Sequence, residues 1–260
     1  MILSPVEQSI KRKIESIGTP LKDWNIKIYR GILTGYNEAF IIDRKKKDEL
    51  ISADPKSAEI IRPILRGRDI KRYGFDFADL WLINTHNGIK DKDIPPVDIN
   101  QYPAVKAHLD KYWDKISVRN DKGYTPYNLR NCVYTDDFSK QKIVWGEISD
   151  KPKFAIDENG DYYVEATSFY MTGDMLFYLL HYLNSSLSKF YFSKLGTTTG
   201  VGTIRWKKFK LEELPIPKPD MLSPETLKKL MGTLNENEAD KLILSIYPFT
   251  SEELSSILEV

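Results

Sequence analysis

Two basic segments contain the residues of this 260-residue chain that are best suited to bind a polyanion. Residues 62–73 place five arginines and lysines around Gly67, with Asp69 as the one acid among them. Residues 197–210 combine threonine hydroxyls with arginine and lysine side chains and contain no acid. Arginine binds phosphate or a guanine edge through two hydrogen bonds, and hydroxyls and loop amides also donate to phosphate oxygens. The candidate nucleic-acid contacts are Arg66, Arg68, Lys71, Arg72, Thr197, Thr198, Thr199, Arg205, Lys207 and Lys208.

The charge of the chain is unevenly distributed. Its net charge is only +1, but residues 212–260 contain ten acids and four lysines, a net charge of −6, which leaves +7 on the first 211 residues. A modestly basic body with an acidic end is typical of a protein that meets a polyanion over a limited face. A structural interpretation stays open: the acidic end could be a solvated helical face, and Arg68 or Arg72 could simply pair with Asp69.

The composition indicates an ordinary globular protein of the reducing cytoplasm. Hydrophobic residues make up 41% of the chain, enough for a sizeable core, and no apolar run is long enough to span a membrane. The N-terminal segment lacks the apolar core of a signal peptide. The single cysteine, Cys132, excludes an intramolecular disulfide.

Motifs of catalysis are missing from the sequence. There is no nucleophile elbow and no Asn-Pro-Pro-Tyr motif, and the Gly-rich residues 196–205 lack the lysine of a phosphate-binding loop. Asp136 and Asp137 precede Glu147 in the manner of a metal-dependent nuclease, but Ser149 occupies the position where that chemistry uses a lysine. We therefore expect no catalytic residue, no metal and no cofactor in this chain, with a metal-dependent nuclease as the alternative.

The hydrophobic spacing predicts an α+β fold: a mixed or antiparallel sheet with flanking helices and a C-terminal helical tail. Ser4, Pro5 and Glu7 predict a capped helix that ends before Gly18. Asn159-Gly160 predicts a hairpin between its two flanking strands. We expect helices at 4–17, 54–61, 102–113, 174–183 and 187–195, with further helices in the last forty residues. We expect strands at 24–29, 80–83, 143–145, 154–156, 162–164 and 168–171, and a strand at 40–42 that returns beside the first.

A collinear series of short motifs resembles a known family. The motifs are residues 24–43, with the run Tyr29-Arg30-Gly31, residues 61–73, residues 178–192, the stretch Ile204-Arg205-Trp206-Lys207-Lys208-Phe209, residues 214–217 and residues 239–254. Each motif is weak by itself, but their order along nearly the whole chain is specific. In this order they resemble the TaqI-like specificity domain at the C-terminal end of type IIG restriction–modification enzymes and related N6-adenine DNA methyltransferases.

The resemblance implies a target recognition domain that reads the sequence of double-stranded DNA. Its partners would be DNA and the methyltransferase and nuclease domains of the same parent polypeptide, which would use S-adenosylmethionine and Mg²⁺. Residues 1–22 would be a linker helix from the methyltransferase domain, residues 23–220 the recognition domain, and residues 221–260 a C-terminal helical segment. The chain would then be a C-terminal piece without an active site.

Two further interpretations stay open beside this one. Within the resemblance, Arg66 and Gly67 could be structural, with Arg66 bridging to Asp69 and Gly67 forming a required turn. The helical tail could instead make the chain a protein-interaction module.

Overall fold

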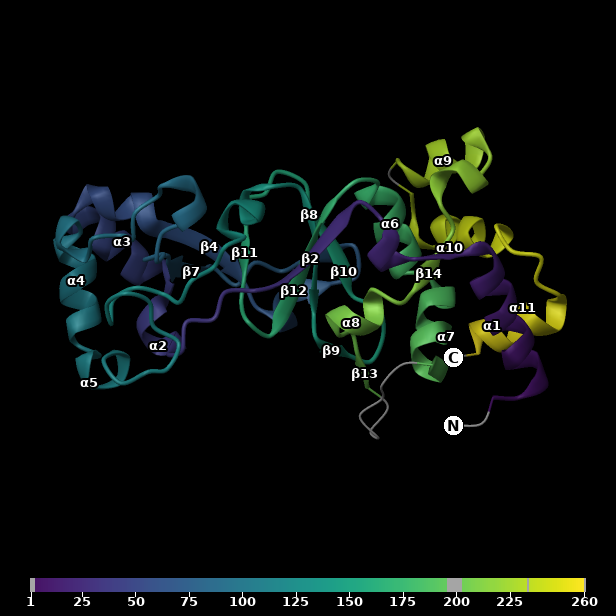
Figure 1. Cartoon of the computed structure of the whole chain (residues 1–260), viewed down its shortest axis with the longest axis horizontal. Coiled ribbons are helices and arrows are strands. Elements are labelled where there is room, and N and C mark those ends of the chain that lie inside the picture. Colours follow the sequence, from purple (N-terminus) through teal and green to yellow (C-terminus); the bar gives the residue numbers. More distant parts are fainter. Residues whose placement is uncertain (1–2, 196–202, 233, 260) are drawn as a thin grey trace.

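The computed structural model describes residues 3–195, 203–232 and 234–259, and it has an elongated shape (Figure 1). A four-stranded central sheet lies in the middle. The helices at residues 5–17, 176–195 and 224–258 form a helical lobe that covers one end. The helices at residues 37–53 and 103–116, together with a second sheet, form a smaller lobe at the other end. The mixture of helices with antiparallel and mixed sheets confirms the predicted α+β class. The predicted domain boundaries at residues 22 and 220 stay a prediction.

The helices that the structure describes are α1 (Pro5–Ile17), α2 (Asn37–Phe40), α3 (Arg44–Ala53), α4 (Pro103–Asp110), α5 (Trp113–Ile116), α6 (Leu176–Leu183), α7 (Ser186–Leu195), α8 (Lys208–Leu211), α9 (Pro224–Leu230), α10 (Glu236–Ser245) and α11 (Ser251–Leu258). The strands are β1 (Thr19–Pro20), β2 (Ile26–Arg30), β3 (Ile41–Asp43), β4 (Ile61–Leu65), β5 (Ile70–Lys71), β6 (Gly74–Phe75), β7 (Leu80–Ile83), β8 (Lys142–Gly146), β9 (Ile148–Ser149), β10 (Phe154–Asp157), β11 (Tyr163–Val164), β12 (Ser168–Gly173), β13 (Ile204–Arg205) and β14 (Pro215–Ile216).

The central sheet has the strand order β10-β8-β12-β2, and all of its pairs are antiparallel. Its side chains alternate between two cores, as the period of a strand requires. Ile143, Trp145 and Met171 face the helical lobe, whereas Val144 and Tyr170 face the smaller lobe. Both faces of the sheet are therefore buried, each by a different part of the chain.

The second sheet has the order β11-β4-β7-β3, with β11 parallel to β4 and the other pairs antiparallel.

Two predictions about strand pairing are wrong. The strands around Asn159-Gly160 form no hairpin, because β10 pairs with β8 and β11 pairs with β4. The strand predicted to return at residues 40–42 pairs with β7 of the second sheet, while β2 joins the central sheet.

A buried ion pair fixes the chain where it leaves the central sheet. The Lys142 ammonium group, which is fully buried, lies 2.5 Å from Asp157 and donates a 2.6 Å hydrogen bond to the carbonyl of Phe138. Asp157 also accepts hydrogen bonds from the backbone N–H groups of Asp161 and Tyr162. Burial lowers the pKa of Lys142, and Asp157 opposes that shift. These contacts hold the turn that leads from β10 to the second sheet.

We expect Asp157→Asn to destabilise the fold strongly, since it leaves the Lys142 charge buried without a counter-ion. The free energy of unfolding should fall by roughly 3 kcal/mol in urea titrations followed by circular dichroism. Glu15→Gln is the matched control, because the Lys11–Glu15 pair lies on the surface and should contribute less than about 1 kcal/mol. Equal effects of the two substitutions would contradict the structural role of the buried pair.

Helix α1 begins as the sequence predicts. Ser4 and Glu7 form a reciprocal capping box, and Ile10 and Ile14 are buried in the helical lobe. Gly18 follows the helix in an extended conformation, and not in the left-handed one that a glycine cap commonly adopts. A Cβ atom at Gly18 would lie 2.5 Å from Pro215, so that glycine is required for the close approach of β14.

The C-terminal helices complete the core of the helical lobe. Ile243 of α10 and Ile257 of α11 are buried there together with residues of α1, α6 and α7. Glu253 of α11 is 4% exposed and accepts hydrogen bonds from Lys13 (2.6 Å) and from Ser9 (2.8 Å). Burial by itself would raise the pKa of Glu253, but the hydrogen bonds, including one from the Thr250 N–H, outweigh it and lower the pKa to about 2.

We expect the contribution of Glu253 to stability to depend on pH. A carboxyl group with a lowered pKa in the folded state stabilises above its unfolded pKa, near 4.5, and this contribution disappears as the pH falls towards 2. Glu253→Gln should therefore destabilise by about 1–2 kcal/mol at pH 6 and by much less at pH 2.5. Glu252→Gln, on the exposed side of the same helix, is the control in thermal unfolding at both pH values.

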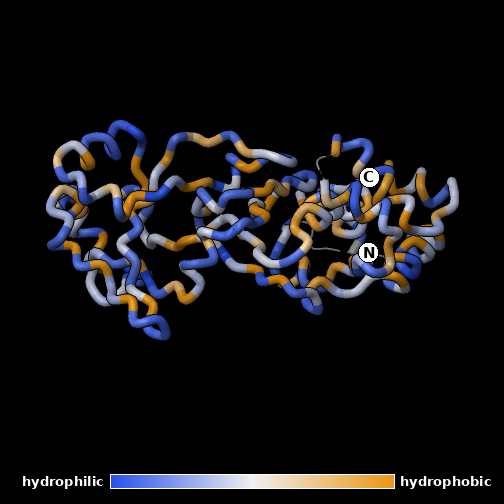
Figure 2. The backbone as a smooth tube through the Cα atoms, turned by 90° about the horizontal axis from the view of Figure 1, so that it is seen from above, coloured by the Kyte–Doolittle hydropathy of each residue, from blue (hydrophilic) through white to orange (hydrophobic). Residues whose placement is uncertain are grey.

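Within the described residues, no helix is both long and apolar enough to span a bilayer. Hydrophobic stretches are short and interrupted by hydrophilic ones throughout the chain (Figure 2).

Candidate nucleic-acid interface

A cleft of about 580 Å³ opens where the 3-10 turn Gly67–Asp69 meets the end of β8. A Cβ atom on Gly146 would lie only 3.1 Å from the Cα of Gly67, and one on Gly67 would lie 3.3 Å from the Cα of Gly146. The two glycines therefore allow the turn and the strand to approach closely at the floor of the cleft. The cleft is lined by Gly67, Arg68, Ile70, Lys71, Gly146, Glu147, Ile148, Ser149, Lys153, Thr167 and Arg205.

Four cationic side chains from three separate segments of the chain line this cleft. Arg68 belongs to the 3-10 turn and Lys71 to β5, whereas Lys153 precedes β10 and Arg205 ends β13. The one acid in the lining is Glu147, and its carboxylate lies 3.5 Å from the Arg205 guanidinium. The walls thus carry more positive than negative charge, which favours a polyanion in the cleft.

Arg68 differs from the other cations of the cleft. Its side chain is exposed, and among the described residues its guanidinium makes no hydrogen bond or ion pair. The Lys71 ammonium donates to the Arg68 carbonyl at 2.9 Å and lies 3.7 Å from Asp76, while Lys153 pairs with Asp150 at 2.9 Å. All five donors of the Arg68 guanidinium are consequently available to a ligand.

The β9–β13 pair brings the second basic segment to the cleft. Arg205 is paired with Ile148, and the backbone N–H of Trp206 donates to the Glu147 carbonyl at 2.8 Å. Trp206 is buried and its carbonyl accepts the indole N–H of Trp145, which anchors the segment on the central sheet. Lys207 and Lys208 follow this anchor; Lys207 lies beside the ring of Phe209, and Lys208 lies 3.6 Å from Glu212.

Two arginines among the predicted contacts of the first basic segment bind the protein itself. Arg66 binds Asp69 through two hydrogen bonds, Nε to Oδ2 at 3.0 Å and Nη2 to Oδ1 at 2.8 Å. Burial would raise the pKa of Asp69, but these bonds and the Arg66 N–H lower it. Arg72 points away from the cleft and contacts Asn184 and Glu236 of the helical lobe. The predicted contacts Thr197, Thr198 and Thr199 lie outside the described residues.

A second hollow of about 540 Å³ adjoins the cleft. The two hollows share Gly67, Arg68 and Thr167, so that Arg68 stands between them. Lys153 and Thr167 also line this site, although the sequence did not mark them as candidates. No local pattern identifies either residue, because each reaches the cleft through the pairing with β8 of the strand that follows it.

The acids of the nuclease alternative are not gathered at one place. Asp136 pairs with Lys92, Asp137 pairs with Lys140, and Glu147 lies in the cleft beside Arg205. The part of the chain that the structure describes contains no group of three acid, histidine or cysteine side chains arranged to hold a metal ion. These contacts give a metal-dependent nuclease in this chain no support.

Two solved structures with a similar fold are a restriction endonuclease and a restriction–modification enzyme. The type IIG restriction endonuclease BpuSI matches with a TM-score of 0.63 and 16% identity, over 98% of this chain and 31% of that chain. The type IIL restriction–modification enzyme MmeI, solved in complex with DNA, matches with a TM-score of 0.64 and 12% identity, over 93% of this chain and 36% of that chain. The chain therefore spans about a third of the length of either enzyme.

A comparison with curated proteins finds no match. The family model described as the TaqI-like C-terminal specificity domain matches residues 62–216, which is more than half of the chain. The matched range contains the four strands that contribute to the cleft lining, β5, β8, β9 and β13, and most of the central sheet. The chain belongs to the family of TaqI-like C-terminal specificity domains.

Proposed function

We propose that this chain recognises a sequence of double-stranded DNA as the specificity domain of a type IIG restriction–modification enzyme. The observation that carries the proposal is the convergence of four cations, from three separate segments, on one cleft in a chain of this family. The similarity of its fold to that of MmeI, which was solved with DNA, supports the same assignment.

In this proposal the cations act on the DNA in two ways. Lys71, Lys153 and Arg205 bind phosphate oxygens and fix the position of the duplex, a contribution that is the same for every sequence. Among the described residues the Arg68 guanidinium has no partner, so its donors are available to read a guanine edge with two hydrogen bonds. Lys207 and Lys208, and the threonines at 197–199, are further proposed phosphate contacts. Arg66 and Arg72 do not contact the DNA in this proposal, because their side chains bind other parts of the protein.

In this proposal, other domains of the same parent polypeptide carry out methyl transfer and DNA cleavage. The comparison enzymes are about three times as long as the aligned part, which leaves room for such domains in a parent protein. S-adenosylmethionine and Mg²⁺ would then be used by those domains, and this chain would supply the DNA specificity.

We expect Lys71→Ala to weaken binding of all duplex sequences alike. Removal of one phosphate contact should lower the slope of log affinity against log salt by about one unit, and the affinity by about tenfold near 0.1 M salt. Fluorescence anisotropy with labelled duplexes measures both. Lys228→Ala is the matched control, because Lys228 is a lysine of α9 in the helical lobe, outside the cleft lining.

Arg68→Ala gives a different expected result. If Arg68 reads a base, the preference for one position of the recognised site should relax by about 1–3 kcal/mol, as a selection from randomised duplexes would show. The proposal fails if the chain binds no duplex at about 50 mM salt, or if Lys228→Ala weakens binding as much as Lys71→Ala does.

A further inference from the structure

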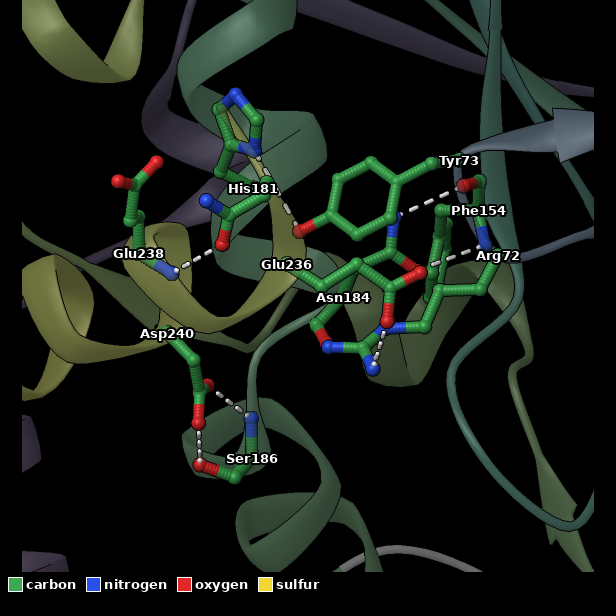
Figure 3. A network of polar contacts seen from close by, with 10 residues as sticks. Arg72, Tyr73, Phe154, His181, Asn184, Ser186, Glu236, Glu238 and Asp240 are labelled. Atoms are coloured by element: carbon green, nitrogen blue, oxygen red, sulfur yellow. Dashed lines mark hydrogen bonds and ion pairs between the residues drawn. The ribbon is translucent and has the colours of Figure 1, made fainter. Parts of the chain in front are cut away.

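The β5–β6 hairpin contacts two parts of the molecule at once. Ile70 and Lys71 line the cleft, whereas the next two residues, Arg72 and Tyr73, contact the helical lobe. Arg72 and Tyr73 form the turn between β5 and β6, so the chain passes from one environment to the other where β5 ends. Figure 3 shows Arg72 and Tyr73 directed towards α6 and α10.

Arg72 joins the hairpin to the ends of two helices. Its Nη2 donates to the carbonyl of Asn184 at 2.9 Å, at the C-terminal end of α6. Its Nη1 donates to the carboxylate of Glu236 at 2.7 Å, at the first residue of α10. A cation at a helix C-terminus and a carboxylate at a helix N-terminus are both favourable. The Asn184 side chain exchanges two hydrogen bonds with the backbone of Phe154, so this contact also reaches β10 (Figure 3).

Tyr73 has an unusual backbone conformation that these neighbours maintain. Its φ is 64°, in the left-handed region where a residue other than glycine persists only when its surroundings hold it. Its N–H donates to the Phe154 carbonyl at 2.9 Å. The His181 Nε2 faces the Gly232 carbonyl at 3.1 Å and must donate to it, so Nδ1 accepts from the Tyr73 hydroxyl at 3.4 Å.

Helix α10 is fixed independently of the hairpin. Asp240 accepts hydrogen bonds from the backbone N–H and the hydroxyl of Ser186, both at 2.7 Å, at the first residue of α7. Asn235 caps α10 by accepting from the N–H of Glu238 at 3.0 Å. Glu236 is therefore held on a fixed element, and Arg72 connects the turn of the β5–β6 hairpin to it.

We propose that α10 positions the β5–β6 hairpin, which carries Lys71 into the cleft, through the Glu236–Arg72 contact. Neither residue lines the cleft, and both act as positioning residues for Arg68 and Lys71. The proposal rests on the proposed binding of DNA in the cleft. Because coupling between two sites is reciprocal, a duplex in the cleft also stabilises the docking of α10. The acidic C-terminal segment thus strengthens the binding of an anion that its charge alone would repel.

The test compares Glu236→Gln with Glu225→Gln in the full chain. Both remove one negative charge from the C-terminal segment, but Glu225 pairs with Lys229 on α9 and makes no contact with the hairpin. Electrostatics alone predicts slightly tighter DNA binding for both variants. Positioning predicts that only Glu236→Gln binds a fluorescein-labelled random-sequence duplex more weakly, by about three- to tenfold. The salt slope stays unchanged, because the phosphate contacts still form.

A second measurement needs no DNA. Hydrogen exchange of the amides of residues 70–75 should be faster in Glu236→Gln than in Glu225→Gln, and Arg72→Lys, which keeps the charge but not the two-armed contact, should behave like Glu236→Gln. If Glu236→Gln binds DNA as tightly as Glu225→Gln, or if hairpin exchange is unchanged, the inference is overturned. If the unmodified chain binds no duplex, the proposed function fails, and the exchange data alone decide whether α10 holds the hairpin.

Discussion

Because side chains alternate along a strand, a sheet can bury both of its faces only if chain segments cover it from two sides. The central sheet meets this constraint with two cores: Trp145 and Met171 pack under the helical lobe, and Val144 and Tyr170 pack under the smaller lobe. Each lobe depends on the sheet for its core, so the two cannot be separated without exposing large apolar side chains to water. The elongated shape follows from this arrangement (Figure 1).

The cleft lies where segments that serve different cores come together. Gly146 ends β8 of the central sheet, and Gly67 belongs to the turn that follows β4 of the second sheet. Their close approach brings Arg68 of the turn and Arg205 of β13 to the same cleft. Paired strands therefore set the shape of the cleft, and the charged side chains project from these strands and their turns. Phosphate contacts can fix the position of a duplex only if the groups that make them are held on such rigid elements.

The helical lobe holds the β5–β6 hairpin from the side opposite the cleft. Arg72 and Tyr73 use hydrogen bonds to α6 and α10 that are remote in sequence, and Lys71 remains directed towards the cleft. The acids of the C-terminal segment are consequently not a uniform repulsive surface. Glu236 and Glu253 make defined contacts, with Arg72 and with Lys13, that tie the end of the chain to its beginning and to the hairpin.

The sequence by itself determined the local elements, because capping and helical periodicity act over a few residues. The capping box at Ser4, the helices of the second half and the β8 strand all lie where the pattern predicts them. It also located both basic segments, together with their family resemblance. Only the tertiary structure decided which strands pair, since Asp157 and Lys142 redirect β10 away from the hairpin that Asn-Gly predicts. It also decided between the open alternatives for Arg66, which binds its near neighbour Asp69. Arg72 is engaged by Glu236, which lies 164 residues further along the chain, a contact that no local pattern specifies.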